Sequence, residues 1–282
     1  MKKMSKVEII VATHKAYEYP KGDAYLPLHV GAKISDKKLE IARDDTGDNI
    51  SDKNPYFCEL TGQFWIWKHS KADYKGLVHY RRLFTLKKGS IKKENRIKAA
   101  LSDKEIEELI KNYDIILPKK RNYYIESLWS HYEHTLHVGP LEKTGEIIKR
   151  LTPKYYEEFE RLKTRKTAHM FNMMIAKKEI FDSYNKWLFK ILFELEKEMK
   201  EDPELVANYD TFHQRFYGRI SELLLDVWLY TEYPGLKTSD EKDDNVRVKE
   251  IRVIDVEGVN WIKKGGSFIL AKFTGRKYGK SF

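Results

Sequence analysis

The sequence predicts an α/β fold in which a mostly parallel sheet is flanked by helices, with a helix-rich C-terminal half. The first observation is that strand-like segments rich in β-branched residues alternate with segments whose apolar residues recur at helical spacing. The second is that the pattern after Ser127 is mostly helical, with one strand-like break. This alternation is typical of domains built on a parallel sheet. The chain has 282 residues, of which 41% are hydrophobic, so it can build a large core.

Three segments of the first half have the composition of strands. They are residues 7–13 (VEIIVAT), 74–84 (YKGLVHYRRLF) and 113–120 (YDIILPKK). Each contains a short apolar run rich in β-branched residues and is followed by polar residues. We therefore expect three buried strands.

Two helices are predicted between these strands. Residues 54–70 place apolar side chains on one face, with Asn54 as the cap and Pro55 at the first helical position. Ser102 and Glu105 have the spacing of a capping box and open a second amphipathic helix.

The second half predicts a strand that enters a long helix, then a core helix, an acidic loop and a late strand or hairpin. These segments are residues 168–181, 179–200, 218–232, 234–245 and 246–259. The acidic loop indicates a boundary. We expect residues 1–233 to form the main domain, and residues 234–282 to hold the loop, the late strand and a basic aromatic tail.

The cysteine content and the N-terminal segment indicate the cellular compartment. Cys58 is the single cysteine, which excludes an intrachain disulfide and a thiolate metal cluster. The apolar run after the basic N-terminus is about six residues long, too short for a signal peptide or a membrane span. These features predict a cytoplasmic protein.

The net charge of +10 predicts an anionic partner. Residues 261–282 hold six Lys or Arg and no acid, interleaved with aromatic and aliphatic residues. Such a segment suits the inner face of a membrane, where cations meet anionic lipids. A disordered basic tail is the alternative, and composition leaves both open.

The three clearest strands end in basic or proton-bearing turns: THK, HYRR (residues 79–82) and LPKK. Parallel strands present their carboxyl ends at one edge of a sheet, where ligands bind. We therefore interpret HYRR as a clamp for a diphosphate. The alternative is that Arg81 and Arg82 pair with local acids, and strand alternation allows both to face a ligand only if the strand has already ended.

An acidic loop at residues 42–54 offers carboxylates to a divalent cation or to ligand hydroxyls. It does not fit an EF-hand, because its glycine is misplaced and no glutamate closes it. In the functional interpretation, Asp48 and Asn49 contact ligand hydroxyls. In the structural one, they only shape the turn before the next helix.

Other motifs narrow the chemistry. No dinucleotide fingerprint, phosphate-binding loop or nucleophile elbow is present. His131, His134 and His137 spread over too much of a helix to share one zinc ion readily, so no metal site is assigned. Glu222 stands at the start of an apolar helix, either as a capping carboxylate or as a partly buried base for a hydroxyl group.

Five segments, in order, resemble a family of bacterial capsular and exopolysaccharide glycosyltransferases that was long catalogued as a domain of unknown function. They are DDTGDNISDKNPYFCELTGQFWIWKH, YKGLVHYRRLF, YDIILPKKRNYY, FNMMIAKKEIFDSYNKWLFKILFELE and GRISELLLDVWL. The resemblance covers residues 7–230. It implies a GT-A-like fold and transfer of a hexose, galactose in pyranose or furanose form, from a UDP-sugar to a repeat unit on a lipid carrier.

The resemblance also implies roles for individual residues. Thr13 and His14 lie where such folds hold the nucleotide, and Asn49, Tyr80, Arg81 and Arg82 join them as donor-binding residues. His79, Asp48 and Glu222 are the implied catalytic residues, with Glu222 or Asp48 as the base. HYRR stands near where many GT-A enzymes carry an Asp-x-Asp motif, so the arginines can replace the metal, although manganese or magnesium remains possible. Leu223 and Pro140 depart from the family pattern.

Two other functions remain open. A nucleic-acid-binding α/β protein would also be basic, but 43 acidic residues are interspersed with the cations and no RNA-binding signature is present, so no nucleic acid is expected. A non-catalytic carbohydrate-binding subunit is the other alternative. The intact HYRR motif favours the enzyme.

Overall fold

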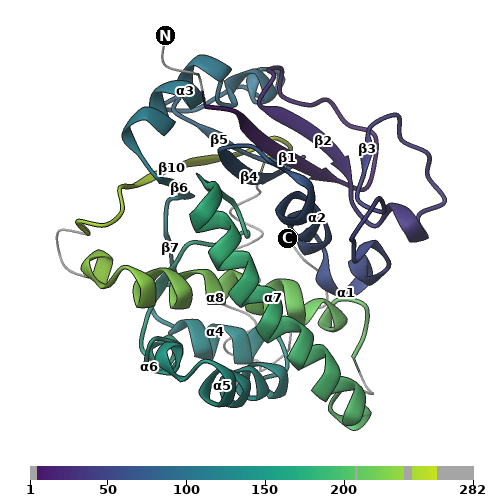
Figure 1. The fold of residues 1–282 in the computed structure, drawn as a ribbon, viewed down its shortest axis with the longest axis vertical. Coiled ribbons are helices and arrows are strands. Elements are labelled where there is room, and N and C mark those ends of the chain that lie inside the picture. The colour runs from purple at the N-terminus through teal and green to yellow at the C-terminus, as the bar shows by residue number, and fades with distance from the viewer. Residues whose placement is uncertain (1–4, 207–208, 238–242, 259–282) are drawn as a thin grey trace.

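An eight-stranded sheet forms the centre of the protein (Figure 1). The computed structural model describes residues 5–206, 209–237 and 243–258. The strands follow the spatial order β3–β2–β1–β4–β5–β10–β6–β9. Their bounds are β1 (Val7–Thr13), β2 (Tyr25–His29), β3 (Ala42–Arg43), β4 (Tyr74–His79), β5 (Arg82–Thr85), β6 (Ile115–Pro118), β9 (Met174–Lys177) and β10 (Val248–Asp255). A separate pair joins β7 (Arg121–Asn122) to β8 (Thr167–Ala168).

The sheet is mixed, which corrects the expectation of a mostly parallel one. Strands β1, β2, β3 and β4 are mutually parallel, and β10 is parallel to β6. In contrast, β5 runs antiparallel to β4 and β10, and β9 runs antiparallel to β4 and β6. The reason for the first exception is local, because a two-residue turn between β4 and β5 can join only antiparallel strands.

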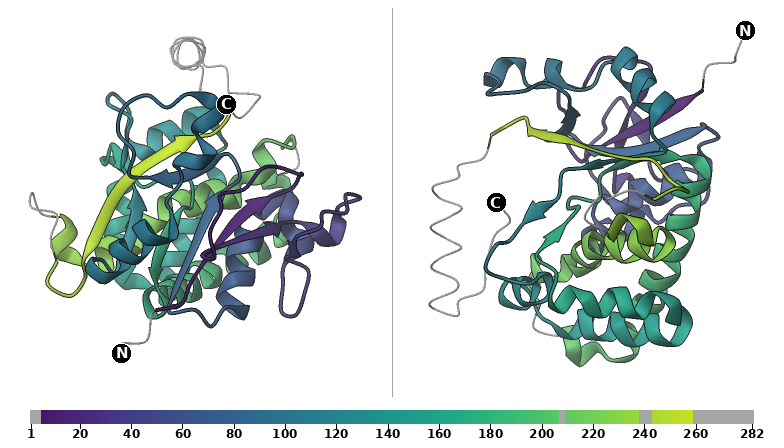
Figure 2. Two further views of the ribbon diagram at one scale, coloured as in Figure 1. Left: turned by 90° about the horizontal axis from the view of Figure 1, so that it is seen from above. Right: turned by 90° about the vertical axis from the view of Figure 1, so that its left-hand side faces the viewer.

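Helices cover the sheet and extend below it. Their bounds are α1 (Asn54–Phe57), α2 (Leu60–His69), α3 (Asp103–Asn112), α4 (Leu128–Thr135), α5 (Gly139–Leu151), α6 (Tyr156–Glu160), α7 (Lys178–Glu201) and α8 (Phe216–Glu232). Figure 1 shows α4, α5, α6 and α8 gathered in the lower part, with α7 running from the sheet toward them. Figure 2 shows the same division from the side, with the strands above the helical part. The α/β prediction is confirmed.

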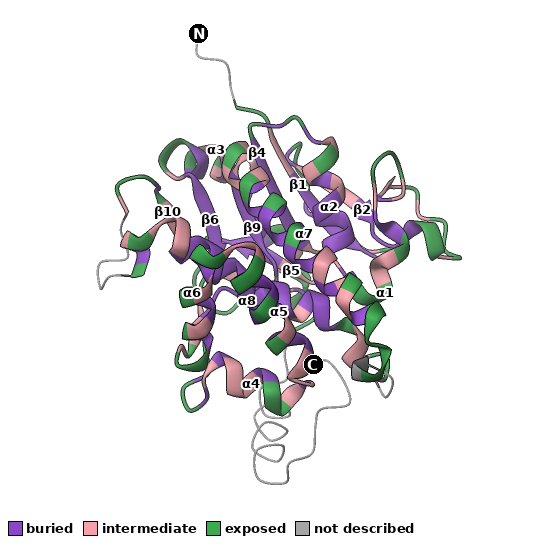
Figure 3. Ribbon diagram, turned by 60° about the horizontal axis from the view of Figure 1, so that its bottom comes forward, coloured by how far each residue is buried: buried purple, intermediate pink, exposed green. Residues whose placement is uncertain are grey.

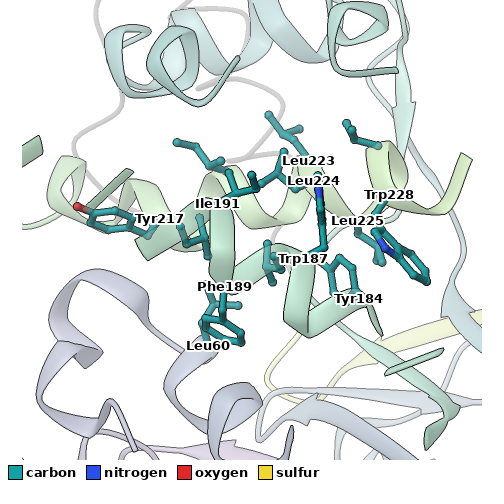
Figure 4. Close-up of a cluster of buried hydrophobic side chains, with 14 of the residues drawn as sticks. Leu60, Tyr184, Trp187, Phe189, Ile191, Tyr217, Leu223, Leu224, Leu225 and Trp228 are labelled. Carbon is teal, nitrogen blue, oxygen red and sulfur yellow. The ribbon is translucent and has the colours of Figure 1, made fainter. Parts of the chain in front are cut away.

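Side chains of β1 alternate between two hydrophobic clusters, one on each face of the sheet. Ile10 and Ala12 belong to the larger cluster with α2, α7 and α8, whereas Ile9 and Val11 belong to the smaller cluster with α3. Figure 3 shows the buried strands between partly exposed helices. In the larger cluster, shown in Figure 4, the rings of Tyr184 on α7 and Trp228 on α8 lie 5.4 Å apart. The α8 helix, which carries Glu222, is therefore held in place by the core.

Local chemistry confirms one helix start and corrects another. Ser102 and Glu105 make both hydrogen bonds of the predicted capping box. The single helix predicted at residues 54–70 is instead divided, because Cys58 adopts a left-handed backbone with φ 55°. Asn54 does not cap the helix, since its amide donates to the Cys58 carbonyl at 2.7 Å.

The late strand is β10, and it lies inside the main sheet between β5 and β6. Residues after the predicted boundary at 233 therefore contribute to the same sheet up to Asp255. The basic aromatic tail at residues 261–282 lies outside the described residues. Among the residues that the structure describes, no helix has both the length and the apolar character needed to cross a membrane.

Candidate functional site

The HYRR motif is a hairpin turn. His79 ends β4, Arg82 begins β5, and these two residues pair across the turn formed by Tyr80 and Arg81. Paired residues of an antiparallel ladder point to the same face, so the side chains of His79 and Arg82 lie on the same face of the hairpin. The four consecutive polar residues therefore belong to two neighbouring groups of side chains. One group surrounds His79 and Arg82, and the other surrounds the tip of the hairpin, formed by Tyr80 and Arg81.

His79 is held as a neutral imidazole. Its Nε2 lies 2.6 Å from the Phe171 carbonyl oxygen, which can only accept a hydrogen bond, so Nε2 carries the proton. Burial lowers the pKa of His79, and Arg82 and Arg81 lower it further, while Glu59 and the Phe171 bond oppose the shift. The remaining nitrogen, Nδ1, is then an acceptor, which suits a ligand hydroxyl better than a phosphate oxygen.

Arg82 supplies a largely enclosed positive charge. Its guanidinium carbon lies 4.6 Å from the centre of the Phe171 ring, a favourable cation–π contact. Burial lowers the pKa of Arg82, against the effect of Glu222 and Asp255. The guanidinium still remains charged at any physiological pH. Arg82 is therefore permanently charged, and its charge acts on Glu222.

Glu222 is a buried carboxyl group with few direct partners. Its residue exposure is 7%, and the closest cation is Arg219, whose Nη1 lies 3.9 Å from Oε1. Burial raises the pKa of Glu222 and Glu59 adds to the shift, while Arg219, Arg82 and Arg121 oppose it. Helix α8 begins at Phe216, so Glu222 lies beyond the first turn and capping does not explain it. Its environment suits a base that takes a proton from a hydroxyl group.

Glu59 is a second carboxylate of this group, and the sequence analysis missed it. It lies between α1 and α2, immediately after the left-handed Cys58, and its Oε1 accepts a hydrogen bond from Asn172 at 2.8 Å. Both Glu222 and His79 respond electrostatically to Glu59. The signal in the sequence was that Glu59 is the one acidic residue between Asp52 and Asp73. We call Glu59, His79, Arg82 and Glu222 the carboxylate cluster.

Cations gather around the tip of the hairpin. The His14 ring lies edge-on to Tyr80 at 5.4 Å. Burial lowers the pKa of His14, and four cations lower it further: Lys37, Lys15, Arg215 and Arg81. We call these four cations the basic rim. A positive field of this kind attracts a diphosphate.

Two of these cations share one acidic partner. Arg81 and Lys15 lie 3.4 and 3.6 Å from oxygens of Glu257, and all three side chains are about 40% exposed. Ion pairs this exposed are weak, so a bound anion can compete for both cations. Thr13 is buried, and its hydroxyl donates to the Lys15 carbonyl at 2.7 Å, so it shapes the turn that carries His14.

Asp48 and Asn49 lie at the opposite end of α2 from Glu59. The Asp48 carboxylate is 3.2 Å from Lys68, and its carbonyl is 2.9 Å from His69 Nε2, both in the last turn of α2. Glu59 precedes the first turn of this ten-residue helix, which is about 15 Å long. The Asn49 amide donates to the Gly47 carbonyl. The structure therefore does not bring Asp48 or Asn49 to the carboxylate cluster.

The histidines of α4 have a different partner. His131 and His134 both direct Nδ1 at the buried Glu126, at 3.0 and 2.9 Å, and His137 lies beyond the end of the helix. Across residues 5–206, 209–237 and 243–258, no group of three His, Cys, Asp or Glu side chains is arranged to hold a metal ion.

A pocket of about 480 Å³ lies elsewhere, between the start of the segment after α5 and the outer face of α7. It is lined by Tyr155, Trp187, Lys186 and Lys190, among others, and by no carboxylate. It therefore offers no carboxylate base.

Comparisons with known proteins agree with the fold. One solved structure, an apo structure titled WbbM bifunctional glycosyltransferase, is 29% identical and superposes with a TM-score of 0.76. The match covers 90% of this chain and 46% of that one, so the chain spans about half the length of that protein. No curated protein matches the sequence. The family described as "Domain of unknown function (DUF4422)" matches residues 8–233, most of the chain, and the protein therefore belongs to this family.

Proposed function

We propose that this protein is a glycosyltransferase that moves a hexose from a UDP-sugar to a growing capsular or exopolysaccharide unit on a lipid carrier. The hexose is galactose, in pyranose or furanose form. The observation that carries the proposal is that one hairpin, HYRR, serves both groups: the charge of Arg82 acts on Glu222, a buried carboxyl group of raised pKa, and Arg81 belongs to the basic rim. The similarity to a bifunctional glycosyltransferase supports the reaction class.

Sugar transfer requires a base on one side of the reacting carbon and positive charge on the other. In the proposed mechanism, Glu222 takes the proton of the acceptor hydroxyl, whose oxygen forms a bond to the anomeric carbon. The bond to the diphosphate breaks, and UDP leaves with the electron pair. Arg81 and its neighbours in the basic rim stabilise the charge that develops on UDP. His79 accepts a hydrogen bond from a sugar hydroxyl through Nδ1.

No step of this mechanism passes through a divalent cation. The described carboxylates and histidines do not form a metal-binding set, whereas the basic rim already supplies positive charge where the diphosphate would lie. We therefore expect nucleotide binding that does not depend on manganese.

The test compares ligand binding with turnover. Thermal shift with UDP, UDP-galactose, UDP-galactofuranose and a short DNA, each with and without manganese, identifies the ligand class. A ligand at 100 times its Kd stabilises the fold by about 2.7 kcal/mol. A UDP-selective shift is expected, and a salt-sensitive shift with DNA alone would contradict the proposal.

Variants then separate the two parts of the site. Arg81→Ala should lower kcat/KM about 100-fold or more, because it removes a preorganised group worth about 3 kcal/mol in the transition state. Glu222→Gln should abolish transfer and keep UDP binding, because it removes only the base. The control is Arg150→Ala, an exposed arginine paired with glutamates of α7. Turnover of both site variants within a few-fold of wild type would refute the assignment.

In this proposal, the basic aromatic tail binds the inner face of the membrane. Anionic vesicles should retain the full chain and release a variant truncated after residue 260, because the six cations of the tail are then lost. Unchanged vesicle binding by the truncated chain would remove this part of the proposal.

A further inference from the structure

The turn between β8 and β9, residues 169–172, has an unusual backbone. Phe171 and Asn172 are consecutive non-glycine residues with left-handed backbones, at φ 81° and 53°. Each such residue costs on the order of 1–3 kcal/mol, and the strain persists only where the surroundings enforce it. The contacts of this turn show what enforces it.

Phe171 contacts both paired residues of the HYRR hairpin. Its carbonyl oxygen accepts the His79 Nε2 hydrogen bond at 2.6 Å, and its ring lies under the Arg82 guanidinium at 4.6 Å. The left-handed backbone directs the carbonyl and the ring at the two strands of one hairpin. The turn thereby sets the orientation of His79 and Arg82.

Asn172 connects the two elements that carry the carboxylates. Its Nδ2 donates to Glu59 Oε1 at 2.8 Å and to the Gly218 carbonyl at 3.1 Å, and its Oδ1 accepts from the Ser221 hydroxyl at 2.8 Å. A carbonyl can only accept, and Glu59 also accepts when it is ionised. The amide nitrogen must then face both of them, which leaves Oδ1 for Ser221. All the partners together permit one amide orientation.

His169 anchors the turn from its other end. Its backbone N–H and its Nδ1 contact the two oxygens of Asp226, and its Nε2 lies 2.9 Å from Glu250 on β10. Asp226 follows Glu222 by four residues, one helical turn further along α8. The turn is therefore bonded to α8 both before and after Glu222.

We propose that Asn172 is a positioning residue that holds the Glu59 carboxylate against the start of α8, so that the negative charge of Glu59 keeps a fixed place relative to Glu222, the residue that exchanges the acceptor proton. This inference rests on the proposed function. Asn172 itself touches no reacting atom. Its role is to hold one carboxylate by a hydrogen bond, so that the charge of this carboxylate acts on Glu222 from a constant position.

Several charged groups act on these carboxyl groups. The charges of Arg219 of α8, Arg82 of β5, Arg121 of β7 and Glu59 act on Glu222. Glu59 in turn acts on His79 and Arg215. An added negative charge at position 172 opposes ionisation of Glu222 and moves its proton loss to higher pH.

The test is Asn172→Asp, which preserves size and removes the donor to Glu59. The acidic limb of the kcat profile should move upward by about one pH unit or more. At neutral pH kcat should fall about tenfold, while the KM for the sugar donor should stay within about twofold, because the basic rim is unchanged. The matched control is Asn112→Asp on α3, where the Asn112 amide also donates to a glutamate, at 3.2 Å from Glu108. It should change neither quantity.

A second readout needs no turnover. Carbon-13 NMR of labelled glutamate carboxyl groups, with the Glu222 signal assigned by Glu222→Gln, follows this carboxyl group directly in the wild type and in Asn172→Asp. The Glu222 titration should move to higher pH in Asn172→Asp, and an unchanged titration would overturn the inference even if the protein transferred no sugar. Absence of turnover in the wild type, with the expected NMR shift, would refute only the proposed function.

A third variant applies if Asn172→Asp does not fold. Asn172→Gly keeps the left-handed backbone and removes the amide without adding charge. Its kcat should fall about tenfold at an unchanged donor KM. Wild-type kcat in this variant would overturn the inference.

Discussion

The buried pair of His169 and Asp226 predicts how the stability of the protein depends on pH. Burial would lower the pKa of His169, but the charge of Asp226 and the hydrogen bonds to Asp226 and Glu250 outweigh it and raise the pKa to about 9. A histidine in the unfolded chain titrates near 6.5. The folded state therefore holds a proton that the unfolded state releases between these values.

The sign and size of the effect follow from this difference. Because the folded pKa is the higher one, the stabilisation is fully present below about pH 6.5 and is lost as the pH rises through about 9. The 2.5 units between the two values correspond to about 3 kcal/mol, at 1.36 kcal/mol per unit. That amount is a large part of the unfolding free energy of a typical domain, about 5–15 kcal/mol.

Four other histidines contribute a slope of opposite sign at lower pH. The fold lowers the pKa of His14, His29, His79 and His131. Because these side chains titrate near 6.5 in the unfolded chain, their contribution to the unfolding free energy rises with pH and is nearly complete by about pH 7.5.

The assay is urea unfolding of the full chain at a series of pH values from 6 to 9.5. The contribution of His169 to the unfolding free energy should fall by about 3 kcal/mol over this range, measured as the difference between the wild type and Asp226→Asn. Asp226→Asn removes the largest contribution that raises the pKa of His169, so it should abolish most of this pH dependence of the unfolding free energy. The control is Asp210→Asn, which changes an exposed aspartate that contacts His213 at 2.7 Å. A wild-type free energy that stays constant between pH 7 and 9, or an unchanged slope in Asp226→Asn, would refute the reasoning.

Three further substitutions test the packing and the site. Glu222→Gln should raise the unfolding free energy at pH 7, measured by urea unfolding, because it removes a carboxylate whose ionisation burial opposes. A loss of stability would indicate a structural ion pair instead. Gly62→Ala should lower the unfolding free energy by about 1–2 kcal/mol, since the new Cβ would lie 2.8 Å from the Val30 side chain in the core, and an unchanged Tm would contradict this. Ser102→Ala should cost about 1 kcal/mol through loss of the capping box, whereas the exposed Ser90→Ala should cost nothing measurable by the same urea unfolding.

Much of the architecture is encoded locally, and those parts could be predicted. The strand at residues 7–13, the capping box at Ser102 and Glu105, and the late strand all depend on side chains that are close in sequence. The carboxyl ends of β1 and β4 meet as expected because the two strands are parallel neighbours, which brings His14 to Tyr80. Glu222 and the HYRR residues could therefore be named as site candidates from the sequence alone.

The remaining features depend on contacts between distant segments. Asp48 was a plausible base by composition, but the length of α2 separates it from Glu59 and the carboxylate cluster. Glu59 enters the site only because Cys58 takes a left-handed backbone, and such a backbone at a non-glycine residue has no signature in the sequence. The left-handed backbones of Phe171 and Asn172 likewise have no signature in the sequence.

The sequence by itself therefore determined the α/β class, the main strands and helices, and the family, because each depends on local composition or on motifs in a fixed order. The tertiary structure alone decided that the sheet is mixed, that β10 lies inside it, and that Glu59, Glu222, His79 and Arg82 converge. The physical reason is that burial, backbone strain and the field of neighbouring charges are created by packing, and packing joins residues that are far apart in the sequence, as Lys15 and Glu257 are.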